Sequence, residues 1–269
     1  MKRFVVLDKP IGQTPLQAIL EWKSRHPRYK PLPATYAGRL DPMASGNLLV
    51  LLGEECKKKE HYMGLDKQYT VSVLLDLATD TGDALGMPHY AGVHTLATGD
   101  EIRDVVKAEV GTRTHAYPAY SSKTVNGIPL FLHALSGTLS GITVPTHSET
   151  MYSISLKRIE SVDILTLSAY IDLALRVVPR DDLESKEAGM DFRQDAIRDA
   201  WRELFTSMPD RSFTILTLTV VAGTGAYMRT LAERLGQALG TSALAVSIHR
   251  TRIGRYRAIG PLRFFFPSY

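Results

Sequence analysis

Stretches with the alternation of a β-strand are interleaved with helical stretches along this chain, and this mixture limits the possible folds more than any other feature. The run QYTVSVLLDL places Tyr69, Val71, Val73 and Leu75 on one face of a strand. Further strand-like runs are FVVLDK, NLLVLLG, SFTILTLTVV and ALAVSIHR. Because no regular βαβ period emerges, we predict an α+β fold with a mixed, mainly antiparallel sheet flanked by helices and loops.

Several segments between these strands carry helix signals. Thr14 followed by proline predicts a helix start, and Leu16, Ile19 and Leu20 predict its apolar face. A capping box in TGDEIRDVVKAEVG predicts a second helix that ends at Gly111. DFRQDAIRDAWRELF has amphipathic helical spacing, and AYMRTLAERLG predicts a helix after the loop AGTG.

Length and composition indicate an ordinary globular protein. The 269 residues contain 44% hydrophobic and 22% charged residues and one cysteine, Cys56, which excludes an internal disulfide and a cysteine-based zinc site. No signal-peptide core or membrane-length apolar run is present, so we expect a cytoplasmic protein without a membrane partner. We expect one domain over residues 1–269, with 179–211 as a peripheral insertion.

Positive charge is concentrated in two places. WKSRHPRYK precedes an Asp–Pro turn, and no acidic residue follows Glu233. The arginines beyond that point are Arg234, Arg250, Arg252, Arg255, Arg257 and Arg263. Two basic patches favour a nucleic-acid partner, because neutralising phosphates dominates that kind of binding; a solvated basic face is the alternative for either run alone.

Two charged residues are candidates for a site. Asp41 lies in YAGRLDPMASG, where it is either a turn residue or a carboxylate at the mouth of a site. Arg229 lies in the first turn of the predicted helix AYMRTLAERLG. A guanidinium there opposes the helix macrodipole, so it is either exposed or compensated by a carboxylate or a phosphate.

Two loops have weaker signals. Asp76, Asp80 and Asp83 in LLDLATDTGD are either a divalent-cation site or ordinary turn and cap residues. AYPAYSSKTVNG mixes aromatic and cationic residues, which suits stacking on unpaired bases but also suits a plain surface loop.

Taken in order, these segments resemble the TruB-type tRNA pseudouridine synthases. The resemblance is carried by LDKPIGQTP, AGRLDPMASGNLLVLLGEECK, DKQYTVSVLLDLATDTGDALG, AYPAYSSKTVNGIPLFLHA, AGTGAYMRTLAERLG and HRTRIGRY, which together span most of the chain. It implies the pseudouridine synthase fold, a thumb-like insertion at about 112–145, and an additional segment at 179–211. The family's C-terminal PUA domain is expected to be absent, with the basic tail partly substituting.

The resemblance also implies roles for individual residues. Asp41 is expected to be the catalytic nucleophile or the group that loosens the glycosidic bond, and Tyr69 to stack on the target base and serve in the proton step. Arg229 is expected to keep Asp41 ionised and oriented, since an adjacent cation lowers the pKa of a carboxylate. Residues expected to bind the substrate or brace the site are Lys9, Pro10, Tyr36, Arg39, Tyr120, Lys123, Tyr227, Arg250 and Arg252.

The reaction implied is conversion of uridine to pseudouridine at position 55, in the T-loop of tRNA. It requires no cofactor and no metal, and the expected partner of the monomer is the tRNA T-arm, with no obligate protein partner. Tyr36 replaces the family's usual His, Asp76 a Gly, and Tyr117 one of two prolines in the thumb. Three alternatives stay open: the same chemistry on another RNA, a non-catalytic tRNA-folding chaperone, and a metal-dependent hydrolase built on the three aspartates of LLDLATDTGD.

Overall fold

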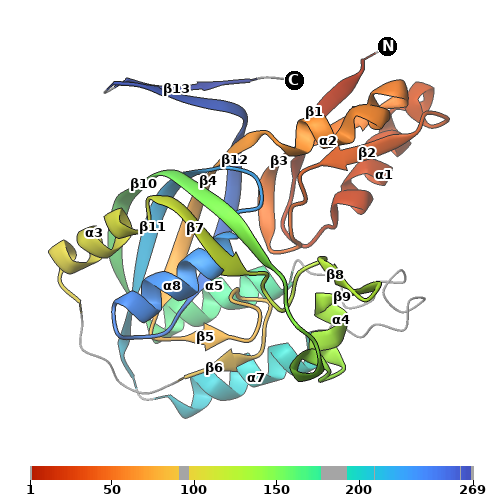
Figure 1. Cartoon of the computed structure of the whole chain (residues 1–269). Helices are drawn as coiled ribbons and strands as arrows, with labels where there is room; N and C mark the ends of the chain where they lie inside the picture. Colours follow the sequence, from red (N-terminus) through yellow and green to blue (C-terminus); the bar gives the residue numbers. More distant parts are fainter. Residues whose placement is uncertain (1, 91–96, 177–192, 209, 261, 268–269) are drawn as a thin grey trace.

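Nine strands form one sheet in the computed structural model, which describes residues 2–90, 97–176, 193–208, 210–260 and 262–267 (Figure 1). Among the described pairings only that of β12 with β3 is parallel, which confirms the predicted mixed, mainly antiparallel sheet. The order is β1 (Phe4–Lys9), β3 (Ala44–Leu52), β12 (Ala243–Ile259), β4 (Asp66–Leu75), β11 (Ser212–Ala222), β10 (Thr146–Asp163) and β7 (Gly111–Ala116), with β2 (Ala34–Ala37) on β3 and β13 (Leu262–Phe266) on β12.

Helices cover both faces of this sheet, and none of those described is long and apolar enough to cross a membrane. They are α1 (Pro15–Arg25), α2 (Lys59–Met63), α3 (Gly99–Ala108), α4 (Leu130–Leu135), α5 (Ile164–Arg176), α7 (Gln194–Ser207) and α8 (Met228–Ala238). Shorter elements are β5 (Ala78–Thr79), β6 (Pro88–His89), β8 (Thr124–Val125), β9 (Ile128–Pro129) and the 3-10 turns η1 (Pro27–Tyr29), η2 (Gly53–Lys58) and η3 (Leu139–Gly141).

The alternation of β4 divides the interior into layers, because successive side chains of a strand point to opposite faces. Tyr69, Val71 and Val73 share one face of β4, as predicted, and are buried there in a core with α1, α3 and α8. Leu74 points the other way, into a second core with α5 and α7. Figure 1 shows α8 in front of the sheet and α5 behind it. The site described below lies where the first residues of α8 meet the loop before β3.

The first helix starts as predicted, but its predicted apolar face is wrong for Leu16 and Leu20 and right only for Ile19. Thr14 caps α1 through a capping box. Leu16 and Leu20 are 45% and 51% exposed, whereas Ala18 and Ile19 are buried. The side of α1 that packs on β1 and β2 is therefore rotated from the side that hydrophobicity alone selects.

The strand predicted at ALAVSIHR continues through most of the basic tail, as far as Ile259. This long β12 passes through the centre of the sheet and buries Arg250, and a second arginine beyond Glu233, Arg234, is largely buried on α8. Arg250 is 1% exposed, and the Arg234 side chain, on α8, is 16% exposed. The predicted tail patch is therefore wrong for these two residues, because their guanidinium groups serve internal partners.

The segment predicted as a peripheral insertion contributes to the second core. Residues 179–192 and 209 lie outside the described residues. In α7, Ile197 and Trp201 are each 1% exposed, and the Trp201 indole N–H donates to the Ala84 carbonyl at 3.1 Å. The α7 helix therefore has a packing role in the second core. The range expected to be a thumb-like insertion, about 112–145, holds most of β7, the β8–β9 hairpin, α4 and η3, and is called the thumb-like region below.

Candidate active site

The loop that carries Asp41 connects β2 to β3 and is fixed at several points. The Gly12 amide donates to the Pro42 carbonyl at 2.8 Å, and the Ala44 amide donates to the Asp41 carbonyl at 2.9 Å. Pro42 also restricts the backbone of Asp41 to non-helical angles. The Asp41 side chain is 34% exposed, so a rigid turn presents this carboxylate to solvent at the surface of the sheet.

Arg250, on β12, anchors the same loop through hydrogen bonds to its backbone. Its guanidinium donates to the carbonyls of Asn47 at 2.7 Å, Arg39 at 3.1 Å and Gly38 at 3.1 Å. At 1% exposure the residue has no surface to offer an RNA strand. Arg250 is therefore better described as a positioning residue for the Asp41 loop than as the substrate contact that the sequence suggested.

Arg229 brings three distant segments together at the start of α8. Its guanidinium contacts Asp41 Oδ2 through Nε and Nη2, both at 3.0 Å. It also donates to the Thr81 carbonyl at 2.7 Å and to the Tyr120 carbonyl at 3.0 Å. The side chain is only 5% exposed. The compensating carboxylate expected for an arginine in the first turn of a helix is thus Asp41, 188 positions away.

A second carboxylate backs the pair from inside. Asp83 Oδ2 lies 3.6 Å from Arg229 Nε, and Thr81 donates to its Oδ1 at 2.8 Å. Burial raises the pKa of Asp83, and Arg229 opposes that shift. Burial by itself would lower the pKa of Arg229, but Asp41 and Asp83 together raise it above its ordinary value. The guanidinium thus stays charged between an inner and an outer carboxylate.

Two buried lysines add positive charge near the loop. Lys9, fully buried, donates to the carbonyls of Pro10 at 2.8 Å and Gln13 at 2.7 Å, and burial lowers its pKa to about 8 although Asp41 opposes the shift. Lys67 donates to the Met63 carbonyl at 2.9 Å, and burial lowers its pKa to about 8 as well. These cations favour anions at this end of the sheet.

Aromatic rings from three segments, Tyr117 of the thumb-like region, His147 of β10 and Tyr227 before α8, cluster beside the Asp41–Arg229 pair. Tyr117 stacks on His147 with ring centroids 4.2 Å apart and meets Tyr227 edge-on at 6.3 Å. The Lys123 ammonium lies 5.3 Å from the centroid of the Tyr117 ring. Burial raises the pKa of Tyr227, and the nearby Asp41 carboxylate raises it further. The border of the site therefore combines rings with a cation, as base-binding surfaces do.

Comparison of the sequence with protein-family models shows which family carries the Asp41–Arg229 site. The model of the TruB family pseudouridylate synthase, N-terminal domain, matches residues 28–173, which is more than half of the chain. The chain belongs to the TruB family. The matched range includes Asp41, Tyr69, Asp83 and the thumb-like region, whereas Arg229 lies outside it.

Curated relatives agree with this assignment. The tRNA pseudouridine synthase B of Psychrobacter cryohalolentis is 25% identical over 256 residues, which cover 94% of this chain and 56% of that protein. Those of Aromatoleum aromaticum and Geobacter sulfurreducens are 28% and 26% identical, covering 94% and 95% of this chain and 63% and 66% of theirs. The chain therefore spans between half and two thirds of the length of these relatives.

The fold is also similar to that of a chain in the solved structure "Crystal Structure of a Cbf5-Nop10-Gar1 Complex". The TM-score is 0.54 at 18% identity, over 93% of this chain and 48% of the other. Together with the TruB family model, this similarity confirms the predicted pseudouridine synthase fold.

The other residues expected at the site of a TruB family member range from buried to exposed. Tyr69 is 8% exposed on β4, where it pairs with Arg250 and Val220 on the neighbouring strands. Tyr36, on β2, is partly buried, with the Lys59 ammonium 5.3 Å from its ring centroid. Pro10, Arg39, Lys123 and Arg252 are exposed and available to a partner.

Tyr120 contributes its backbone to the TruB site, while its side chain is engaged elsewhere. Its hydroxyl donates to Asp80 at 2.8 Å and accepts from Arg193 at 2.9 Å. Burial and the bond to Asp80 raise the pKa of Tyr120 to about 12. The Arg193 guanidinium carbon lies 5.4 Å from the centroid of the Tyr120 ring and covers one of its faces. Stacking of this ring on a substrate base therefore stays a prediction.

The three aspartates of the LLDLATDTGD loop do not converge. Asp76 pairs with Arg211, Asp80 with Arg193, and Asp83 with Arg229. In the described part of the chain, no three His, Cys, Asp or Glu side chains are grouped as metal ligands would be. Each carboxylate instead has a cationic partner of its own, and the sequence missed that Asp83 belongs to the Arg229 site.

Proposed function

We propose that this protein isomerises uridine to pseudouridine in tRNA, at position 55 of the T-loop. The observation that carries the proposal is the Arg229–Asp41 contact at 3.0 Å, which holds a partly exposed carboxylate at a fixed turn in a TruB family chain. The names of the curated relatives, tRNA pseudouridine synthase B, support the class of substrate.

In this proposal the substrate uridine leaves its stack and enters beside Asp41, at a cost of a few kcal/mol for unstacking. The Asp41 carboxylate acts on the nucleoside as the N1–C1′ bond breaks, in the manner of carboxylates that form covalent intermediates. The uracil then turns so that C5 faces C1′, and the C5–C1′ bond forms. The C5 proton leaves and N1 gains one, so substrate and product are isomers and no co-reactant is consumed.

Other residues position these groups. Arg229 orients the Asp41 carboxylate, and its remaining hydrogen bonds to the Thr81 and Tyr120 carbonyls fix the guanidinium itself. We assign the stacking of the base and the proton step to Tyr69, which is buried on β4 and pairs across the strands with Arg250, the residue that anchors the Asp41 loop. Such rigid placement favours reaction because the reacting groups are already aligned.

The test is incubation of the protein with an unmodified tRNA transcript, followed by chemical mapping of pseudouridine. The wild type is expected to modify position 55, and Asp41→Asn to leave every uridine unmodified while folding normally, because Asp41 is partly exposed. A transcript with cytidine at position 55 is the control for position. Product formed by Asp41→Asn, or no product with the wild type, would refute the proposal.

A further inference from the structure

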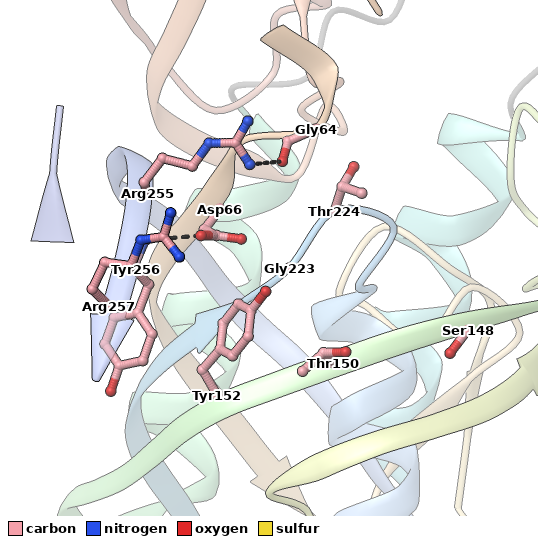
Figure 2. Close-up of a pocket in the computed structure, with 10 residues that line it drawn as sticks. All are labelled: Gly64, Asp66, Ser148, Thr150, Tyr152, Gly223, Thr224, Arg255, Tyr256 and Arg257. Carbon is pink, nitrogen blue, oxygen red and sulfur yellow. Dashed lines mark hydrogen bonds between the residues drawn. The ribbon is translucent and has the colours of Figure 1, made fainter. Parts of the chain in front are cut away.

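A cavity lies outside the Asp41–Arg229 site, where the end of β12 passes β4 and β10. Its volume is about 330 Å³, and Figure 2 shows the residues around it. Tyr152 of β10, Arg255 and Arg257 of β12 and Thr224 of the loop after β11 line it. No residue that the mechanism above uses belongs to this lining.

Aromatic surface is available in this cavity. Tyr152 is 40% exposed, and its ring stacks on that of Tyr256 with centroids 5.4 Å apart and planes 28° from parallel. A ring that is supported on one face and open to solvent over much of its surface is suited to stack on an unpaired base, at little cost in side-chain entropy.

Positive charge lies beside this ring. Arg255 donates to the Gly64 carbonyl at 3.2 Å. Within the part of the chain that the structure describes, the exposed Arg257 guanidinium has no hydrogen-bond partner. The buried Asp66 carboxylate also lines the cavity, where it accepts the Tyr256 amide at 2.8 Å and, after burial, contributes to raising the pKa of the nearby Tyr152 hydroxyl. The unpartnered guanidinium of Arg257 therefore suits a phosphate.

One loop connects this cavity to the proposed reaction centre. Thr224 lines the cavity, and Arg229 lies five residues later, so their Cα atoms are at most ~18 Å apart. Thr224 is anchored by its hydroxyl, which donates to the Met63 carbonyl at 2.9 Å. A strand of RNA that presents one base at Asp41 can therefore reach the cavity with a nearby nucleotide.

We propose that the cavity binds a second, unpaired nucleotide of the RNA substrate, with its base on the Tyr152 ring and its phosphate at Arg255 and Arg257. The inference deepens the proposed function and rests on RNA being the substrate. It assigns part of the RNA affinity to residues outside the catalytic centre, on β10 and the C-terminal end of β12.

The test measures binding of a fluorescent, unmodified T-arm hairpin by the full chain carrying Asp41→Asn, so that the RNA is not converted. Adding Tyr152→Ala is expected to raise Kd by about 5- to 150-fold, the range for loss of one stacked base. Tyr152→Phe keeps the ring and is expected to bind within twofold of the parent. Adding Arg257→Gln is expected to lower the slope of log K against log salt by about 0.7.

The matched control is Arg103→Gln, which removes an exposed arginine on α3 that is paired with Asp100. Equal binding by Arg257→Gln, Tyr152→Ala and Arg103→Gln would overturn the proposal. Displacement of the RNA by free UMP as effectively as by unlabelled hairpin would also overturn it, because the cavity would then be a site for free nucleotides.

The same proteins separate this inference from the proposed function. Pseudouridine formed by the wild type together with unaltered binding by both cavity variants would leave the function standing and remove the cavity from it. Weakened binding by both variants, with no pseudouridine formed by the wild type, would support the cavity as an RNA site and refute the isomerase.

Discussion

Arg229 is the residue on which the site is built. It is buried, it lies in the first turn of a helix, and it contacts Asp41 outside and Asp83 inside. Removing one member of a buried ion pair is strongly destabilising, by about 3–5 kcal/mol, because a charge stays behind without a partner. The consequences of substituting Arg229 should therefore depend on the state of Asp83.

A double-mutant cycle measures this dependence. Arg229→Met is expected to lower the free energy of unfolding by about 3–5 kcal/mol. In the presence of Asp83→Asn the same substitution should cost less, with a coupling of about 1–3 kcal/mol, since no buried carboxylate is then left unpaired. Chemical denaturation gives all four values. Additive effects would show that Asp83 does not share the Arg229 site.

The sequence indicated part of this arrangement at the level of single residues. The helix macrodipole left Arg229 either exposed or compensated by an anion, and the family motifs selected Asp41 as its partner. Nothing local predicted that Arg250 is buried, because its neighbours HRTR look like a surface patch. Its partners Gly38, Arg39 and Asn47 lie more than 200 positions away, so only the central place of β12 in the sheet determines its role.

At the scale of elements, the close contact of β3 with β12 depends on Gly46. Its φ is +97°, and a Cβ there would lie 2.4 Å from the Arg250 carbonyl oxygen. Gly46→Ala is therefore expected to separate the strands and lower the free energy of unfolding. It should also slow pseudouridine formation, because β3 begins three residues after Asp41.

Gly137 provides the matched control for this substitution. It also has a positive φ, +69°, but a Cβ there would have nothing within 4 Å. Gly137→Ala is expected to cost only the backbone strain, about 1–2 kcal/mol, and to leave the rate unchanged. Equal losses of unfolding free energy for the two variants would mean that the strand contact is not limiting.

The packing of α7 gives a second prediction at this scale. Trp201→Ala is expected to lower the free energy of unfolding by about 3–5 kcal/mol, because a fully buried indole leaves a cavity. Trp201→Phe should cost less, since much of the volume is kept and only the bond to the Ala84 carbonyl is lost. If thermal denaturation shows neither variant to be destabilised, α7 is dispensable to the core.

Local patterns predicted most elements but not their full extent. Strand-like runs identified β4 and β11, Thr14 followed by proline identified the start of α1, and a capping box identified the start of α3. The long β10 and helix α5 were not predicted, and β12 was predicted too short. Strands this long, which are exposed at one end and buried at the other, do not keep a single periodicity, so tertiary pairing rather than pattern sets their limits.

For the molecule as a whole, the buried lysines predict how stability changes with pH. Lys9 has a pKa of about 8 in the folded protein against an ordinary 10.5. Between these values the unfolded chain binds more protons than the folded one, so this residue makes stability rise with pH from about 8 to 10.5. The rise in unfolding free energy from about pH 7.5 to 9.5 should be smaller in Lys9→Met, by on the order of 1 kcal/mol.

Denaturant titrations of both proteins at the two pH values check this prediction. Exposed Lys2, replaced by methionine, is the control and should follow the wild type. A wild-type curve that Lys9→Met reproduces in full would show that the buried ammonium does not lose its proton in this range.

The central claim for the whole molecule is that the Asp41 carboxylate, held at a fixed turn, is the reactive group. The rate of pseudouridine formation in a single turnover tests this claim most directly. With saturating, unmodified tRNA, the wild type should form pseudouridine at position 55, whereas Asp41→Asn should bind the same tRNA and form none. Pseudouridine formation at comparable rates by both proteins would contradict the account.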